Sequence, residues 1–229
     1  MKVLLISDVH SNLPALEAIL QDAGSFDLAV SAGDTVGYGP YPDQCVHMLR
    51  TLKFLSVRGN HDDVIVGLNL NIGWFNDDAQ RAIIIQKDML SVDSFEWLKA
   101  LPLEIEVKLG DKNLVVYHGS PTHPLTSYIY EREANMISTH LLKQTGANIL
   151  LLGHTHIPYV VRSCDGVILN PGSVGQPRDG NAKASYMILE SESLEIQNRR
   201  IDYNIDITAE AIFKAGLPVN FAHRLYRGF

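Results

Sequence analysis

The sequence predicts an α/β fold in which two sheets form a sandwich within one domain, residues 1–229. Three observations support this prediction. The chain opens as β-α-β-α-β, a mostly helical stretch follows at about residues 62–100, and the remainder is dominated by β-hairpins. Its 229 residues, 46% of them hydrophobic, suit one globular unit, and no Pro/Gly/Ser-rich linker divides them.

The first half of the chain supplies parallel strands joined by helices. Lys2–Ile6 is a short apolar run, as expected of a strand buried on both faces. Asn12 precedes a stretch in which apolar residues recur every three or four positions, and Pro14 suits the first turn of the helix that this spacing predicts. The alternation continues with a strand at Asp27–Ala32, a helix at Pro42–Leu52 and a strand at Phe54–Val57. Such β-α-β units imply parallel strands with helical crossovers.

The second half supplies hairpins and three further elements. The three predicted hairpins pair Glu104–Leu109 with Asn113–Tyr117, Ile157–Arg162 with Val167–Leu169, and Ala184–Glu190 with Leu194–Ile201. A helix at Tyr130–Gln144 is expected to end at Gly146, and Ile149–Leu152 is a further buried strand. Thr208 is expected to cap a short helix that ends at Gly216.

Charge and composition restrict the classes of partner. The formal net charge of −7 disfavours non-specific binding to nucleic-acid polymers, which requires a basic surface. No apolar run approaches the roughly 18 residues of a membrane span, and the N-terminus does not resemble a secretory signal. With only Cys45 and Cys164, we expect a cytoplasmic protein with free thiols and no membrane association.

Five short polar motifs each follow a predicted strand directly. They are Asp8-Val9-His10, Gly33-Asp34, Gly59-Asn60-His61-Asp62, His118-Gly119 and Gly153-His154-Thr155-His156. If these strands share a sheet and a direction, all five motifs lie along one edge of it, where α/β sheets form their ligand sites. Asp8 and His10 are two residues apart on a segment that we expect to be extended, which would direct both side chains to one side, and the pair His154 and His156 repeats this spacing.

The residue types in these motifs indicate a transition-metal site. Buried carboxylates need a compensating positive charge, and imidazole combined with carboxylate suits Mn, Fe, Zn, Co or Ni better than Ca or Mg. Seven candidate ligands are too many for one ion but suffice for two ions that share a carboxylate. Paired ions of this kind recur in hydrolytic sites that act at phosphorus.

In their order and composition the five motifs resemble the signature of the calcineurin-like metallophosphoesterases, which reads D-x-H, G-D, G-N-H-D/E, H and G-H-x-H. The stretches 33–40 and 170–180 are similar to those of the compact prokaryotic branch of predicted phosphoesterases. The resemblance implies a four-layer α/β/β/α sandwich of two mixed sheets flanked by helices. It also implies two divalent metal ions, with Mn first and Fe, Zn, Ni or Co as alternatives.

The family's ligand sets transfer to this sequence residue by residue. The resemblance implies a first ion held by Asp8, His10, Asp34 and His156, and a second held by Asp34, Asn60, His118 and His154, so that Asp34 bridges the two. A hydroxide between the ions would attack phosphorus. His61 would donate a proton to the leaving oxygen or stabilise it, and Asp62 would orient His61. The Asp-Arg pair that protein phosphatases of this fold carry in the G-D motif is absent, which disfavours a phosphoprotein substrate.

Phosphodiester hydrolysis of a small substrate is the leading expectation. The alternatives are a phosphomonoesterase, a dinucleoside-polyphosphate hydrolase, or a non-catalytic protein-binding scaffold of the same fold. Specificity is expected to reside in segments 62–80, 119–130 and 175–183, where Arg178 is a candidate phosphate-binding residue and a solvent-exposed partner of Asp179 is the alternative. The sequence leaves open whether Tyr38, Tyr41 or Trp74 contacts substrate, and which oligomeric state the protein adopts.

Overall fold

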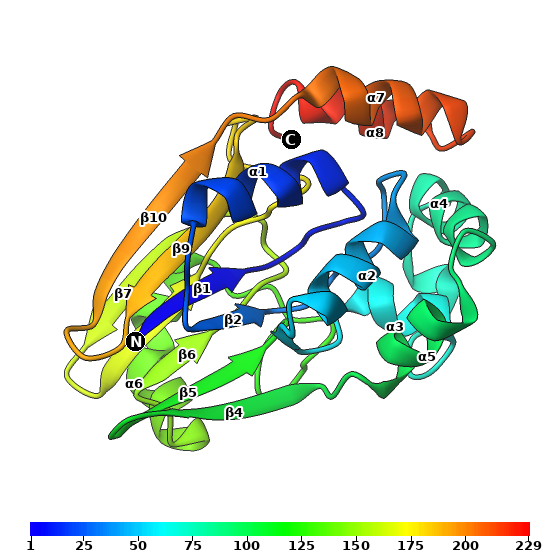
Figure 1. Cartoon of the computed structure of the whole chain (residues 1–229). Coiled ribbons are helices and arrows are strands. Elements are labelled where there is room, and N and C mark those ends of the chain that lie inside the picture. Colours follow the sequence, from blue (N-terminus) through cyan, green and yellow to red (C-terminus); the bar gives the residue numbers. More distant parts are fainter.

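Two mixed five-stranded sheets lie face to face in the computed structural model, which describes residues 1–229 (Figure 1). The first sheet has the order β10-β9-β1-β2-β3, formed by Glu195–Ile201, Ala184–Glu190, Lys2–Ile6, Leu28–Ser31 and Leu55–Ser56. The second has the order β4-β5-β6-β8-β7, formed by Glu104–Leu109, Lys112–Tyr117, Ile149–Leu151, Gly166–Asn170 and Tyr159–Ser163. Helices α1 (Leu13–Ala23) and α2 (Pro42–Thr51) pack on the first sheet, and α6 (Glu131–Thr145) packs on the second. The predicted four-layer α/β/β/α sandwich is therefore confirmed.

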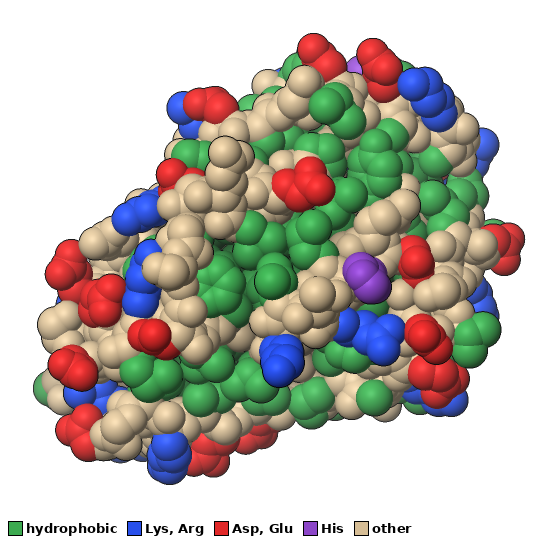
Figure 2. Space-filling model, in the orientation of Figure 1, with side chains coloured by type: hydrophobic (Ala, Val, Ile, Leu, Met, Phe, Trp, Pro, Cys, Tyr) green, Lys and Arg blue, Asp and Glu red, His purple; other side chains and the backbone are tan.

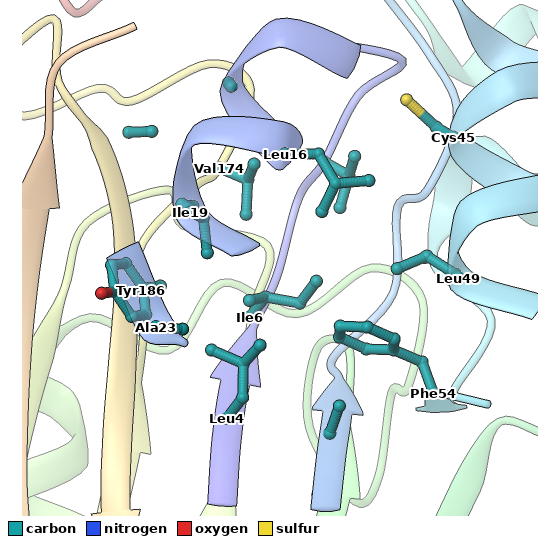
Figure 3. Packing of buried hydrophobic residues seen from close by; sticks show 14 of the residues in the cluster. Leu4, Ile6, Leu16, Ile19, Ala23, Cys45, Leu49, Phe54, Val174 and Tyr186 are labelled. Carbon is teal, nitrogen blue, oxygen red and sulfur yellow. The ribbon is translucent and has the colours of Figure 1, made fainter. Parts of the chain in front are cut away.

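Strand β1 shows why the sequence forms this sandwich. Its side chains alternate between two apolar environments: Leu4 and Ile6 pack against α1, whereas Val3 and Leu5 pack against the second sheet. The alternation follows from the two-residue period of a strand, and Figure 3 shows Leu4 and Ile6 directed toward the helix layer. Both faces are covered, which explains why the strand is a continuous apolar run.

The predicted mostly helical stretch contains three α-helices and a short 3₁₀ helix. They are α3 (Asn60–Val66), η1 (Ile72–Trp74), α4 (Asp77–Lys87) and α5 (Val92–Ala100). The side chain of Asn76 caps α4 by accepting a hydrogen bond from the backbone N–H of Ala79, and Ser91 caps α5 in the same way. These helices lie at one end of the sandwich and form a small apolar core of their own with α2 (Figure 1).

The C-terminal segment differs from the prediction in two ways. Helix α7 (Ile205–Lys214) begins after Asn204, which caps it, so Thr208 lies inside the helix and is not its cap. The Thr208 hydroxyl instead donates a hydrogen bond to Asn12 Oδ1 over 2.9 Å, and the two residues are 196 positions apart in the sequence. A further helix, α8 (Val219–Leu225), was not predicted, and with α7 it packs against Ala82 of α4.

Charged side chains of both signs are interspersed over the face drawn in Figure 2, and apolar side chains gather toward its middle. No continuous basic stretch crosses this face. None of the helices combines the length and the apolar character that a membrane span requires.

The strand directions bring the polar motifs to one edge of the sandwich. Strand β1 is parallel to β2 and β2 to β3, while β5, β6 and β8 are parallel within the other sheet. In Figure 1 the arrowheads of β1, β2, β5 and β6 point toward the same side of the molecule, where the segments that follow them meet.

Candidate metal centre

All seven predicted metal ligands lie together at this edge, and each is at most 2% exposed. They follow the ends of five strands, and together they are Asp8, His10, Asp34, Asn60, His118, His154 and His156. Their nitrogen and oxygen atoms form two neighbouring groups that share one carboxylate.

The first group consists of Asp8, His10 and His156. Asp8 Oδ1 lies 3.2 Å from His156 Nε2 and 3.7 Å from His10 Nε2, and the two Nε2 atoms are 3.1 Å apart. All three atoms therefore surround one small volume that a single ion could occupy.

The second group consists of Asp34, Asn60, His118 and His154. His118 Nε2 lies 2.8 Å from Asn60 Oδ1, 3.0 Å from His154 Nδ1 and 3.4 Å from Asp34 Oδ2. Asp34 Oδ2 is also 3.6 Å from His10 Nε2 of the first group. One carboxylate oxygen thus lies at nearly equal distances from the two groups, as a bridging ligand would.

The backbone fixes which nitrogen each histidine presents. The Nδ1 atoms of His10, His118 and His156 lie 3.0, 2.8 and 2.6 Å from the carbonyl oxygens of Val36, Ala32 and Gln176. A carbonyl oxygen can only accept, so each Nδ1 carries a proton and each Nε2 points into the site, where it offers a lone pair once the ring is neutral. Outer contacts of this kind orient imidazole ligands in metal sites.

The first group fits a cation. The Nε2 atoms of His10 and His156 face each other with their lone pairs, so neither can donate to the other. Asp8 Oδ1 is buried and has no hydrogen-bond partner. Buried acceptors that face one another are costly unless a positive charge lies between them.

The ionisation of all these groups except His118 suits metal binding. Burial would raise the pKa of both Asp8 and Asp34, but the surrounding histidines outweigh it and hold each pKa below its usual value. Burial lowers the pKa of His10, of His156, and of His154, the last to about 2. For His118, burial is outweighed by the nearby carboxylates, chiefly Asp34, and its pKa rises to about 9. Metal ligation requires ionised carboxylates and neutral imidazoles, so His118 has to release a proton when a metal ion binds.

The prediction of an extended backbone at the D-x-H and H-x-H motifs is wrong. Asp8 and His10 have φ angles of 54° and 47°, and His154 and His156 have 66° and 60°, all in the left-handed region. Non-glycine residues adopt this region uncommonly, and residues that do so often lie at functional sites. The tight turns send His156 to the first group and His154 to the second, the division that the resemblance implied.

His61 lies in the cleft beside both groups. Its ring nitrogen is within 4.8 Å of the candidate ligand atoms of His10 and Asp34. Its backbone N–H donates to Asp34 Oδ1 over 2.8 Å, which helps to hold the shared carboxylate. The ring is packed against the rings of Tyr38 and Phe75, with centroid distances of 4.4 and 4.7 Å.

Asp62 does not make the expected contact with the imidazole of His61. Its carboxylate accepts hydrogen bonds of 3.0 Å from the backbone N–H groups of Gly59 and Val36, and His61 Nδ1 is buried without a partner. Asp62 therefore joins the loop before α3 to the loop that carries Asp34, whereas aromatic packing sets the position of His61. Burial and the charge of Asp34 raise the pKa of Asp62 to about 7.

A cleft of about 280 Å³ opens over the two groups. All three segments expected to determine specificity contribute to its wall, through Trp74, Phe75, Asn76, Tyr128 and Arg178. Tyr38 lines the cleft but Tyr41 does not; Tyr41 packs against the core under α1. Trp74 is 45% exposed and Phe75 only 8%.

Arg178 is not paired with Asp179, because that carboxylate binds Arg200. One terminal nitrogen of Arg178 instead donates to Gln176 Oε1 at 3.1 Å and lies 3.4 Å from the Tyr38 hydroxyl. The guanidinium carbon is 5.9 Å from the centre of the Tyr38 ring. Arg178 therefore reaches the cleft with its charge uncompensated by a carboxylate.

Two residues that shape the site were not anticipated. Tyr128 stacks on His154 with a centroid distance of 3.8 Å. Gln86, fully buried on α4, accepts from the backbone N–H of Gly37 over 2.8 Å and so holds the loop beside His61. No sequence motif marks either residue, since both act through segments far along the chain.

Comparison with known proteins gives matches to one family model and to several relatives. The model of the calcineurin-like phosphoesterase superfamily domain matches residues 1–194. A protein of unassigned function from Methanocaldococcus jannaschii, MJ0912, is 34% identical over 99% of this chain and 98% of its own length. The phosphodiesterase YfcE of Escherichia coli is 25% identical over 86% of this chain and 91% of its own.

Solved structures show the same relationship. The crystal structure of a metallophosphoesterase from Sphaerobacter thermophilus superposes with a TM-score of 0.86 and 38% identity, and the match covers 100% of this chain and 99% of that one. The fold, the family match and the buried ligand set thus agree, and the chain belongs to the calcineurin-like phosphoesterase superfamily.

Proposed function

We propose that the protein is a dinuclear metal-dependent phosphodiesterase that acts on small phosphoesters. The observation that carries this proposal is the position of Asp34 Oδ2, 3.6 Å from His10 Nε2 and 3.4 Å from His118 Nε2. A shared carboxylate between two buried sets of nitrogen and oxygen ligands is the arrangement that paired hydrolytic metal ions require.

The residues divide between two ions as the groups suggest. Asp8, His10, Asp34 and His156 would hold the first, and Asp34, Asn60, His118 and His154 the second. Mn²⁺ is the first choice, and Fe, Zn, Ni and Co share the same preference for imidazole and carboxylate. When bound, such ions polarise the phosphoryl group and lower the pKa of water.

The remaining cleft residues act on the substrate itself. Arg178 can hold a non-bridging phosphate oxygen, because its guanidinium is the one cationic side chain lining the cleft. His61 Nδ1 is buried, so its Nε2 is the nitrogen that can reach a leaving oxygen and supply a proton or a hydrogen bond. Tyr38 and Phe75 hold the imidazole in that orientation.

Two features favour small esters and catalysis over the alternatives. A cleft of about 280 Å³ with one cation leaves little room for a nucleic-acid polymer. A protein-binding scaffold would not need seven buried ligands, two of them ionised carboxylates, and the set here is complete. A phosphomonoesterase would use the same metal ligands, so only the choice of substrate distinguishes it from a phosphodiesterase.

The proposal is tested by hydrolysis after metal exchange. Protein treated with a chelator and then reloaded with Mn²⁺ should hydrolyse bis(p-nitrophenyl) phosphate with a higher kcat/KM than p-nitrophenyl phosphate. A preference for the monoester would contradict the phosphodiesterase proposal and indicate a phosphomonoesterase. Absence of hydrolysis of both esters by protein that carries two equivalents of metal would refute the enzymatic proposal and favour the scaffold.

A further inference from the structure

Helix α4 carries one buried amide, the side chain of Gln86. It is the one polar residue among the four buried side chains of the helix, and it is fully buried. Its Oε1 accepts from the backbone N–H of Gly37 over 2.8 Å, and its Nε2 donates to the carbonyl of Gly39 over 2.5 Å and to Ser11 Oγ over 3.2 Å. Two of these three bonds hold the loop that follows Asp34.

The orientation of this amide follows from its backbone partners. An N–H group can only donate and a carbonyl oxygen can only accept, so Gly37 faces Oε1 and Gly39 faces Nε2. An apolar side chain would fill the same space without the cost of burying an amide. What the amide adds is therefore a fixed position for the loop, with one hydrogen bond on each side of Tyr38.

Tyr38 adopts a backbone conformation that needs such support. Its φ angle is 57°, in the left-handed region that a tyrosine adopts uncommonly. In this conformation its ring packs on His61, with a centroid distance of 4.4 Å, and on His10, with a centroid distance of 4.6 Å. The bonds from Gln86 thus maintain the place of this ring against the imidazole of His61.

Gly37 also lies directly against the imidazole of His61. A Cβ atom at Gly37 would be only 2.5 Å from His61 Nδ1, and that nitrogen is buried without a hydrogen-bond partner. The loop therefore covers the Nδ1 side of the ring. Since Asp62 does not contact the imidazole, the position of His61 depends on packing against this loop and against Phe75.

Helix α4 holds Phe75 as well. The side-chain amide of Gln80, six residues before Gln86, donates to the carbonyl of Phe75 over 2.7 Å. The ring of Phe75 packs on His61 with a centroid distance of 4.7 Å. Both aromatic residues that contact His61 in the cleft wall are thus attached to α4 by a glutamine, and Gln86 is the fully buried one of the two.

We propose that Gln86 is a positioning residue for His61 and acts through the loop from Gly37 to Gly39. The inference rests on the proposed function, in which His61 acts on the leaving oxygen. A displacement of about 1 Å in a reacting group can cost about 10²-fold in rate. Gln86 does not line the cleft, so its contribution should appear in kcat and not in the binding of metal.

A double-mutant cycle tests this role. Values of kcat are compared for Mn²⁺-loaded wild type, Gln86→Met, His61→Ala and the double variant. The substrates are bis(p-nitrophenyl) phosphate and diphenyl phosphate, which differ in the basicity of the leaving group. Gln86→Met keeps the length of the side chain and removes its hydrogen bonds. It should keep the wild-type metal content and lower kcat about 10- to 100-fold for diphenyl phosphate, and less for the p-nitrophenyl ester.

The His61→Ala background separates positioning from general damage. Two residues that act as one unit have non-additive effects. In this background Gln86→Met should therefore lower kcat by less than about twofold. Gln86→Asn, which keeps an amide but is one methylene shorter, should have a smaller effect in the wild-type background and carries the same cycle if Gln86→Met does not fold.

Asn113→Leu is the matched control. It also removes a buried amide, one that donates to the carbonyl of Gly146 over 3.5 Å, at the end of β5 remote from His118. It should lower stability and leave kcat for both diesters unchanged.

The outcomes separate this inference from the proposed function. A loss of kcat in Gln86→Met that disappears in the His61→Ala background supports the positioning role. An equal loss in both backgrounds, no loss in either, or a loss of bound metal overturns it while the phosphodiesterase stands. Hydrolysis of neither diester by wild-type protein with its full metal content overturns the proposed function and this inference together.

Discussion

His61 is positioned by neighbouring rings and not by a carboxylate, which separates its role from that of the metal ligands. Its side chain lines the cleft, while its backbone N–H supports Asp34. Replacement by alanine should leave metal content unchanged and lower kcat by about 10²–10⁴-fold, the usual contribution of a proton donor. The loss should be larger for diesters whose leaving group is an alkoxide than for bis(p-nitrophenyl) phosphate, because p-nitrophenolate leaves without being protonated. An equal loss for both leaving groups would contradict proton donation and indicate a positioning role.

Asp34 is the one ligand that lies close to both groups. Asp34→Asn should therefore reduce bound metal from two equivalents toward none, whereas Asp8→Asn should affect chiefly the first ion. Elemental analysis of both variants after dialysis against the same free Mn²⁺ concentration measures the difference. If Asp34→Asn retains two equivalents as firmly as the wild type, Asp34 is not the bridge.

The buried imidazole of His61 also links stability to pH in metal-free protein. Burial lowers its pKa to about 4, although the charge of Asp34 acts in the opposite direction. In the unfolded chain a histidine titrates near pH 6.5, so between these values the unfolded state binds one more proton than the folded state. The contribution of His61 to stability is thus present above pH 6.5 and is lost as the pH falls toward 4.

This linkage predicts a measurable difference between variants. In the presence of chelator, the free energy of unfolding should fall with decreasing pH between pH 6.5 and 4.5. His61→Gln should make that fall shallower, by up to about 1.4 kcal/mol per pH unit. Urea unfolding at several pH values provides the slopes. Identical slopes in the two proteins would show that His61 is not neutral in the folded state.

At the scale of elements, helix α3 shows how closely the loops of the site are packed. A Cβ atom at Gly59, which precedes the helix, would overlap Asp34 Oδ1 and the backbone nitrogen of Asp34. Gly67, which ends the helix, has φ of 70° but open space around it. Gly59→Ala should therefore displace Asp34 and abolish metal binding, whereas Gly67→Ala should cost about 1–2 kcal/mol through its backbone conformation alone. Thermal unfolding and Mn²⁺ titration of both variants test this, and normal metal binding by Gly59→Ala would contradict it.

The elements that the sequence predicts well are those whose apolar pattern is local. Strand β1 and helix α1 follow directly from their periodicity, and Asn12 caps α1 as expected. Helix α8 has seven residues and is stabilised by packing on α4 and α7, which no local pattern records. Thr208 and Asn204 are both residue types that cap helices, and only the tertiary bond from Thr208 to Asn12 distinguishes them.

In the candidate site, too, some features could be predicted from the sequence and others depend on the fold. The ligand positions could be predicted because each motif directly follows a strand. The left-handed backbone at Asp8 and His10 could not, because it depends on contacts such as the hydrogen bond from the backbone N–H of His10 to the carbonyl of Asp34. The partners of Asp62 and the contact of Gln86 with Gly37 likewise join segments that only the fold brings together.

At the scale of the whole molecule, the sandwich holds the two sheets in a fixed position relative to each other. The ligands of each group come from both sheets, since Asp8 and His10 follow β1 whereas His156 follows β6. The core between the sheets includes Leu5 and Leu151, both fully buried. The arrangement of the two candidate ligand groups is therefore a property of the packed sandwich and not of any one sheet.

Titration of metal-free protein with Mn²⁺ tests the two-metal account most directly. Hydrolysis of bis(p-nitrophenyl) phosphate is measured after each addition, and bound metal is quantified in the same samples. The account predicts no hydrolysis without metal and a rate that reaches its plateau at two equivalents per chain. Full activity in protein shown to be free of metal, or a plateau at one equivalent, would contradict it.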